Sequence, residues 1–113
     1  MAVAQRNFEI PAGGTVEFVV DVVGGPTTLT GYVGHMQIRE LRTDPDTLAD
    51  IGSDHITVNP STRQVTVRIP SSETSGYVWK RGVYDLLITG PSNDSWRLVE
   101  GRVINSLPVT RGV

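Results

Sequence analysis

Hydrophobic and polar residues alternate over several short stretches of the chain, and this alternation predicts β-strands. The segment 15–23 alternates over its whole length, and so does the segment 83–89. A period of two with one apolar side is typical of a strand that is half buried. The apolar sides of these two segments carry Val16, Phe18, Val20, Val22, Tyr84, Leu86 and Ile88.

Two further stretches predict strands in the middle of the chain. Residues 32–41 place Tyr32, Met36 and Ile38 on one side, and Gly34 within them indicates a bulge or a close neighbour. Residues 56–58 and 64–69 predict a hairpin, because the Asn59-Pro60 pair between them initiates a tight turn. The second arm of this hairpin buries Val65, Val67 and Ile69.

The ends of the chain and its connections are less regular. Residues 3–10 form a first strand, and residues 95–104 return after a hairpin loop at 90–94, with a bulge expected at Glu100-Gly101. The segment 42–55 fits either a surface loop or one helical turn with Asp44 as its cap. Residues 70–74 indicate a crossover with one short helical turn capped by a serine.

About seven strands separated by turns predict one domain over residues 1–113, an Ig-like antiparallel β-sandwich in architecture. The composition agrees, since 16 Val, 12 Thr and 7 Ile stand against only 4 Ala. The expected core contains Val16, Phe18, Val20, Ile38, Val65, Val67, Tyr84, Leu86 and Ile88.

Charge and cysteine content exclude several classes of function. A net charge of −2 offers no overall electrostatic footprint for nucleic acid or an anionic membrane. The absence of cysteine excludes disulfides, thiolate nucleophiles and cysteine-based zinc sites. We expect neither a signal peptide at residues 1–7 nor a transmembrane segment, because no apolar stretch is long enough.

Candidate catalytic and metal-binding groups are few. Ser53, Asp54 and His55 cannot form a hydrolytic triad, because residues adjacent in sequence cannot point at one another. His35 is expected on the outward side of its strand. The acidic residues of the 42–55 segment lack the spacing of a calcium loop, and the paired glycines at 13–14 and 24–25 are turns. We therefore predict no enzymatic activity, no cofactor and no metal site.

An interaction surface is predicted at the 77–81 loop and at the C-terminal tail, 107–113. The loop contains Tyr77, Trp79, Lys80 and Arg81, an aromatic and cationic set that is enriched at interface anchors. Leu107, Val109 and Val113 make the tail apolar without giving it a strand pattern of its own. Trp96 is expected to pack at the core or its rim. The outward sides of the strands carry mixed charge, as solvated surfaces do.

From Leu29 onward the chain has an ordered series of motifs: Leu29-Thr30-Gly31-Tyr32, Met36–Arg39, Ile56–Pro60 with its hairpin to Val65–Ile69, Gly82–Leu86, Leu98–Val103 and Pro108–Arg111. Their order resembles a family of small Ig-like structural proteins of tailed-bacteriophage virions. It is also similar to the N-terminal module of phage baseplate upper proteins. The chain departs from the family in its long acidic loop at 42–54 and its bulky residues at 77–81, two loops that bear on the choice of partner.

The resemblance implies a non-enzymatic virion component that is made in the bacterial cytoplasm and contacts other virion proteins in many copies. A module of the tail, baseplate or fibre attachment is the first hypothesis. A head decoration protein that clamps the major capsid protein is the second. A carbohydrate- or protein-binding sandwich outside phage is the third, and assembly as a homo-oligomer is left open.

Overall fold

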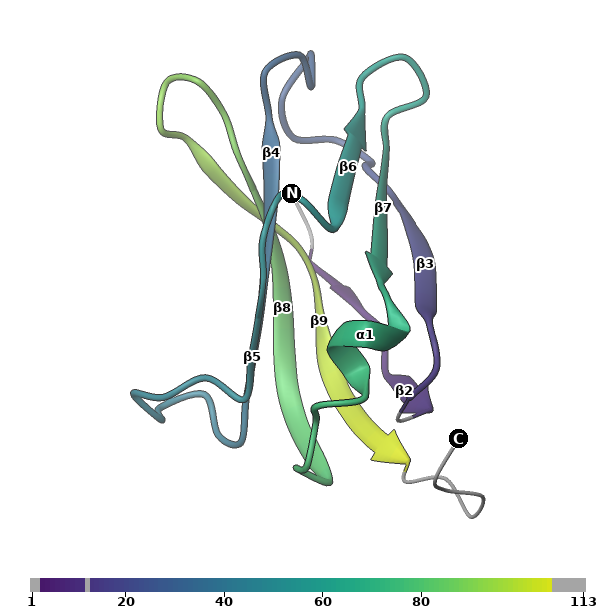
Figure 1. Ribbon diagram of the computed structural model, residues 1–113. Coiled ribbons are helices and arrows are strands. Elements are labelled where there is room, and N and C mark those ends of the chain that lie inside the picture. Colours follow the sequence, from purple (N-terminus) through teal and green to yellow (C-terminus); the bar gives the residue numbers. More distant parts are fainter. Residues whose placement is uncertain (1–2, 12, 107–113) are drawn as a thin grey trace.

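A computed structural model describes residues 3–11 and 13–106, and it is a sandwich of two β-sheets (Figure 1). The larger sheet has the order β1-β9-β8-β4-β5, with β2 also paired to β9, and the smaller has the order β3-β7-β6. The strands are β1 (Ala4–Gln5), β2 (Phe8–Pro11), β3 (Val16–Asp21), β4 (Val33–Arg39), β5 (Ala49–Ile51), β6 (Ile56–Asn59), β7 (Gln64–Ile69), β8 (Arg81–Thr89) and β9 (Ser95–Ser106). The predicted all-β sandwich is confirmed, with nine strands in the described residues where about seven were expected.

The core lies between the two sheets and consists of the inward-facing residues that the alternation predicts. All nine residues of the expected core are buried. Ile10, Leu29, Met36, Ile51 and Val103 join them. Full burial of one such aliphatic side chain contributes about 1.5–3 kcal/mol to the free energy of unfolding. Trp96 packs against this core from the rim, as expected.

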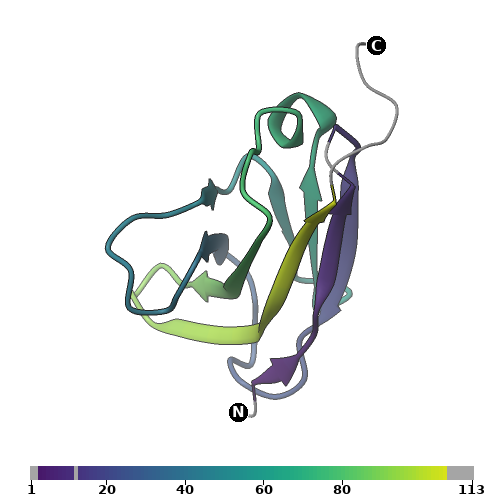
Figure 2. The same cartoon turned by 90° about the horizontal axis from the view of Figure 1, so that it is seen from below.

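The N-terminal segment forms two short strands instead of one, and both run parallel to β9 (Figure 2). Between them the chain runs beside β9 and passes close to Gly101, where an added Cβ would lie 2.0 Å from the Arg6 carbonyl oxygen. The Tyr84 hydroxyl donates to that same carbonyl at 2.6 Å, and the Asn7 side-chain oxygen accepts from the Arg102 amide at 2.9 Å. This close approach therefore depends on a residue without a side chain at position 101.

The bulge in β9 does not lie at Glu100-Gly101, so that prediction was wrong. Leu86 of β8 pairs with Val99 and Leu87 pairs with Arg97, which leaves Leu98 as the extra residue of β9. Leu98 and Val99 are both buried, although they are adjacent. The glycine at position 101 is required by the close approach of Arg6 and not by a bulge.

Of the two alternatives for the segment 42–55, the loop is confirmed, and it contains a short edge strand, β5, which pairs with β4. The alternative helical turn is absent from this described segment, and the Asp44 carboxylate accepts from the Leu41 amide at 3.1 Å instead of capping a helix. Three residues are too few for an alternation to mark a strand, so the sequence pattern did not reveal β5.

The crossover after β7 contains the predicted helical turn, α1 (Ser71–Thr74). Its N-cap is Pro70 and no side chain caps it, so the expected serine cap was wrong. The turn is instead held by Thr74, which is fully buried and donates its hydroxyl to the Gly14 carbonyl oxygen at 2.7 Å.

Gly34 lies in an uninterrupted ladder with β8, so it marks a close neighbour and not a bulge. A Cβ at this position would lie 2.3 Å from Cγ2 of Ile56 in β6. The absence of a side chain here lets the two sheets approach each other.

Gly101→Ala should destabilise the domain by about 1–3 kcal/mol, because the new methyl group overlaps the Arg6 carbonyl and the connection between β1 and β2 must shift away from β9. Gly52→Ala is the matched control, since its Cβ would meet only the Asp54 carboxylate at 3.4 Å. Urea unfolding followed by circular dichroism measures both variants. Equal stabilities for the two would contradict the role given to this close approach.

Asp94 closes the hairpin loop between β8 and β9. Its carboxylate accepts from the Tyr32 hydroxyl and from the Trp96 indole N–H at 2.9 Å. These two donors hold the pKa of Asp94 below its ordinary value of 3.8. A carboxyl whose pKa is lowered by folding stabilises the folded state above its unfolded pKa and loses that contribution as the pH falls through the folded value.

Asp94→Asn should therefore lower the urea midpoint at pH 6, and the difference from the wild type should shrink below pH 3.8. Unfolding curves at several pH values between 6 and 3 measure this difference. A difference that stays constant across that range would show that the charge on Asp94 contributes nothing.

Candidate functional site

The predicted interaction loop lies between α1 and β8, at the end of the sandwich where β9 also ends (Figure 1). Val78 at its tip is 87% exposed, and Lys80 and Arg81 are exposed beside it. The rings of Tyr77 and Trp79 lie on either side of Val78 in sequence, 5.3 Å apart, and both pack against the core. The loop therefore presents one apolar side chain on a rigid aromatic base.

Asn105 of β9 holds this loop in place, and sequence reasoning did not identify it. Its side-chain amide donates to the Trp79 carbonyl oxygen at 2.7 Å and to the Tyr77 carbonyl oxygen at 3.4 Å. Its backbone amide donates to the Lys80 carbonyl oxygen at 2.8 Å. A polar residue within an inward-facing apolar series, with Val99 and Val103, is the sequence signal that could have identified it.

Three buried polar atoms around the loop have no hydrogen-bond partner within the described part of the chain. They are the Tyr77 hydroxyl, the Trp79 indole nitrogen and the Asn105 side-chain oxygen. Burial raises the pKa of Tyr77 to about 12. An unpaired buried group of this kind costs about 1–3 kcal/mol, so the loop has hydrogen-bonding capacity that the fold leaves unused.

The other half of the predicted surface, Leu107, Val109 and Val113, lies outside the described residues. Ser106, the last described residue, ends β9 one position after Asn105, whose backbone amide bonds Lys80 of the loop.

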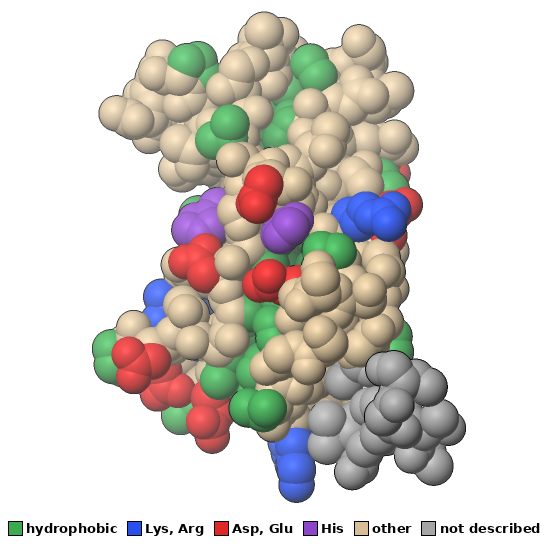
Figure 3. Space-filling model, viewed as in Figure 1, with side chains coloured by type: hydrophobic (Ala, Val, Ile, Leu, Met, Phe, Trp, Pro, Cys, Tyr) green, Lys and Arg blue, Asp and Glu red, His purple; other side chains and the backbone are tan. Residues whose placement is uncertain are grey.

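Both histidines lie on the face shown in Figure 3, each beside a carboxylate. His35 is exposed, as expected, and contacts Asp50, whose pKa it lowers. His55 Nε2 lies 3.7 Å from a carboxylate oxygen of its neighbour Asp54. Residues 3–11 and 13–106 contain no group of three or more His, Cys, Asp or Glu side chains that could hold a metal ion.

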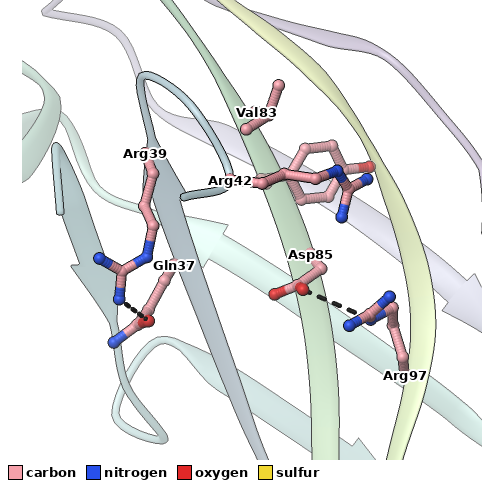
Figure 4. Close-up of a pocket in the computed structure, with 7 residues that line it drawn as sticks. Gln37, Arg39, Arg42, Val83, Asp85 and Arg97 are labelled. Carbon is pink, nitrogen blue, oxygen red and sulfur yellow. Dashed lines mark hydrogen bonds and ion pairs between the residues drawn. The ribbon is translucent and has the colours of Figure 1, made fainter. Parts of the chain in front are cut away.

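A second surface, which sequence reasoning did not identify, lies on the outer side of the larger sheet. A hollow of about 340 Å³ there is lined by Gln37, Arg39, Arg42, Val83, Tyr84, Asp85 and Arg97 (Figure 4). A second hollow of about 450 Å³ adjoins it, shares Arg42 and Val83, and is lined further by Gln5, Arg6, Asn7, Gly101 and Arg102. We call the surface formed by Arg39, Arg42, Arg97 and Arg102 the arginine face.

Two of these arginines are held by carboxylates of the same surface. Arg97 Nε lies 3.4 Å from Oδ2 of Asp85, and Arg97 Nη1 lies 3.4 Å from Oε1 of Glu100. Arg42 extends across β8 (Figure 4), and its Nη2 lies 2.6 Å from Oε2 of Glu100. Because Arg42 lines both hollows, it forms the boundary between them. A hydrogen bond from Gln5 and these two guanidinium groups hold the pKa of Glu100 below its usual range.

The remaining two arginines form no ion pair with a carboxylate of the described residues. Arg39 donates to the Asp44 carbonyl oxygen at 2.8 Å and to the Gln37 side-chain oxygen at 2.9 Å. Arg102 is exposed opposite Val83. The sequence alone identified Arg39 as an outward-facing residue of its strand. It did not reveal the arginine face, because Arg42, Arg97 and Arg102 come from other segments.

The protein is thus a small all-β sandwich that carries the 77–81 loop at one end and the arginine face on the larger sheet. No protein-family model and no curated protein matches the chain. Within the described part of the chain, no helix has the length and apolar character needed to cross a membrane.

Asn105→Ala should destabilise the domain by about 1–3 kcal/mol, because the Tyr77 and Trp79 carbonyl oxygens lose their donor in a buried place. The emission of Trp79 should also change as its loop loosens. Ser106→Ala, one residue further along β9, is the control and should leave stability within about 0.5 kcal/mol of the wild type. Unchanged stability and fluorescence in Asn105→Ala would contradict this anchoring role.

Proposed function

We propose that this protein is a non-enzymatic docking module whose 77–81 loop binds a neighbouring protein. The observation that carries the proposal is the construction of the loop, in which the 87% exposed Val78 stands between two half-buried aromatic residues. A single exposed valine is ordinary on a protein surface, so the weight falls on its neighbours: aromatic rings beside an arginine and a lysine are a composition enriched at interface anchors.

The proposed setting is the virion of a tailed bacteriophage, in the tail, baseplate or fibre-attachment apparatus. The support for this setting is the resemblance of the motifs from Leu29 onward to small Ig-like virion proteins, together with the β-sandwich fold. In that setting the partners are other virion proteins, and the loop and the 107–113 tail contact them together. The sandwich itself acts as a spacer that holds the loop at one end.

Immunogold labelling of purified particles with antibodies against the recombinant chain tests the setting. Gold confined to the tail or its distal end is the expected result. Gold over the head would instead indicate a decoration protein on the capsid. Particles that carry neither label nor the chain by mass spectrometry would overturn the virion assignment altogether.

Three variants test the docking role of the loop and tail. Val78→Asp, Trp79→Ala and deletion of residues 107–113 should each reduce incorporation into particles, because each removes apolar contact from the proposed surface. Quantitative mass spectrometry of purified particles measures the copy number. Truncation of an interface anchor typically costs 2 kcal/mol or more, so a loss of about tenfold or greater is expected for Trp79→Ala.

Val23→Asp is the matched control for Val78→Asp. Val23 is 79% exposed, comparable to Val78, but it lies just after β3 and away from the loop. Its substitution should leave the copy number unchanged. If all three loop and tail variants enter particles at the wild-type level, the interface lies elsewhere.

A further inference from the structure

The arginine face concentrates positive charge on a protein whose net charge is −2. Of the charged residues that line its two hollows, five are arginines and one, Asp85, is a carboxylate. One of the five, Arg6, directs its guanidinium elsewhere, to the Val19 carbonyl oxygen and the Phe18 ring. The other four stand on the outer side of the sheet against Asp85, Glu100 and Asp50, the last joined to Arg39 through hydrogen bonds of Gln37, which leaves an excess of one positive charge (four minus three).

The two arginines of this face that form no ion pair among the described residues have a defined position. Arg39 and Arg102 stand opposite Val83 of β8, one on each neighbouring strand. Val83 therefore forms an apolar floor between two guanidinium groups that lack carboxylate partners among the described residues. Guanidinium groups bind carboxylates through paired hydrogen bonds, and this recognition is stronger than that of a neutral donor.

The surface also presents acceptors, and these decide which kind of anion fits it. The Asp85 side chain is 28% exposed within the first hollow, and amide groups of Gln37, Gln5 and Asn7 line the two hollows. A polypeptide brings both carboxylates for the arginines and N–H groups for these acceptors. A nucleic acid backbone brings a continuous row of phosphates and no N–H groups of its own, so it offers nothing that pairs with Asp85 and Glu100 in the middle of the face.

We infer that the arginine face binds an acidic segment of a partner protein, with carboxylates of that segment on Arg39 and Arg102 and its backbone over Val83. This inference rests on the proposed function for the protein nature of the partner. It adds a second contact surface on the side of the sandwich, separate from the 77–81 loop at its end. Arg42 stands between the two hollows, held by Glu100, and orders the surface before the partner arrives.

Isothermal titration of the purified full-length chain with capped hexaglutamate tests the inference. Saturable binding that weakens as salt is added is expected. Arg39→Gln combined with Arg102→Gln should reduce the affinity by at least about tenfold, because both charge-assisted contacts are lost. Amide chemical shifts of the 15N-labelled chain should change around Val83, Arg97 and Arg102 and stay unchanged in the 77–81 loop.

Arg68→Gln is the matched control for Arg102→Gln alone, since each removes one positive charge from an exposed position and only Arg102 belongs to the arginine face. Arg68→Gln should retain the wild-type affinity within about twofold, which is an energy difference below 0.5 kcal/mol. Thermal unfolding verifies that all of these variants remain folded. Capped hexalysine should not bind.

Three results would overturn the inference: no saturable binding of hexaglutamate, an equal loss of affinity in Arg68→Gln and Arg102→Gln, or tighter binding of a 12-base-pair DNA duplex at the same residues. The last result would assign the face to nucleic acid. Failure here remains distinct from failure of the proposed function, because titration of the purified chain does not depend on its presence in particles. Conversely, the protein could be absent from particles and still bind hexaglutamate in the titration.

Discussion

Leu98 is an extra residue in β9, and it determines which side of the sheet every later residue of that strand faces. Side chains alternate with a period of two along a strand, so a single unpaired residue reverses the facing of all that follow. If Leu98 paired regularly with β8 and formed no bulge, Glu100 and Arg102 would point between the two sheets, and Val99 and Val103 would point to solvent. Burial of unpaired charges costs several kcal/mol each, which the sandwich could not tolerate. The rest of the structure depends on this bulge.

The same reversal creates both surfaces on which the chain can contact other molecules. It turns Asn105 inward, where its amide reaches the carbonyl groups of the 77–81 loop. It turns Glu100 outward, where the carboxylate forms ion pairs with both Arg42 and Arg97. It also leaves Gly101 facing inward at the point where the chain crosses between β1 and β2. One local irregularity in β9 therefore positions the loop, the arginine face and the N-terminal strands.

Much of the fold could be predicted from the sequence, because alternation records which face of a strand is buried. It identified β3, β4, β7 and β8 together with all nine expected core residues. It failed where the information is not local. The bulge was placed at Glu100-Gly101 because glycine commonly marks one, whereas that glycine serves the approach of Arg6, which is 95 positions away in the chain. The short edge strand β5 and the parallel pairing of β1 and β2 likewise exist only through their partners.

The candidate surfaces show the same division between local and distant information. Aromatic and basic residues that follow one another in the chain mark the 77–81 loop, so composition alone pointed to it. The arginine face is assembled from β4, the loop after it and β9, and no segment of the sequence contains more than two of its four arginines.

The net charge of the chain does not reveal this surface, for a physical reason. Attraction between charges is screened within about 8–10 Å at physiological ionic strength, so a partner senses the local excess of arginine and not the sum over the chain. Several of the acidic residues that make the total negative, Asp21, Glu17 and Asp54 among them, lie on β3 or on the connection to β6, away from the two hollows. A weakly acidic protein can thus offer an acidic partner a cationic binding surface, provided that the fold separates the two signs of charge.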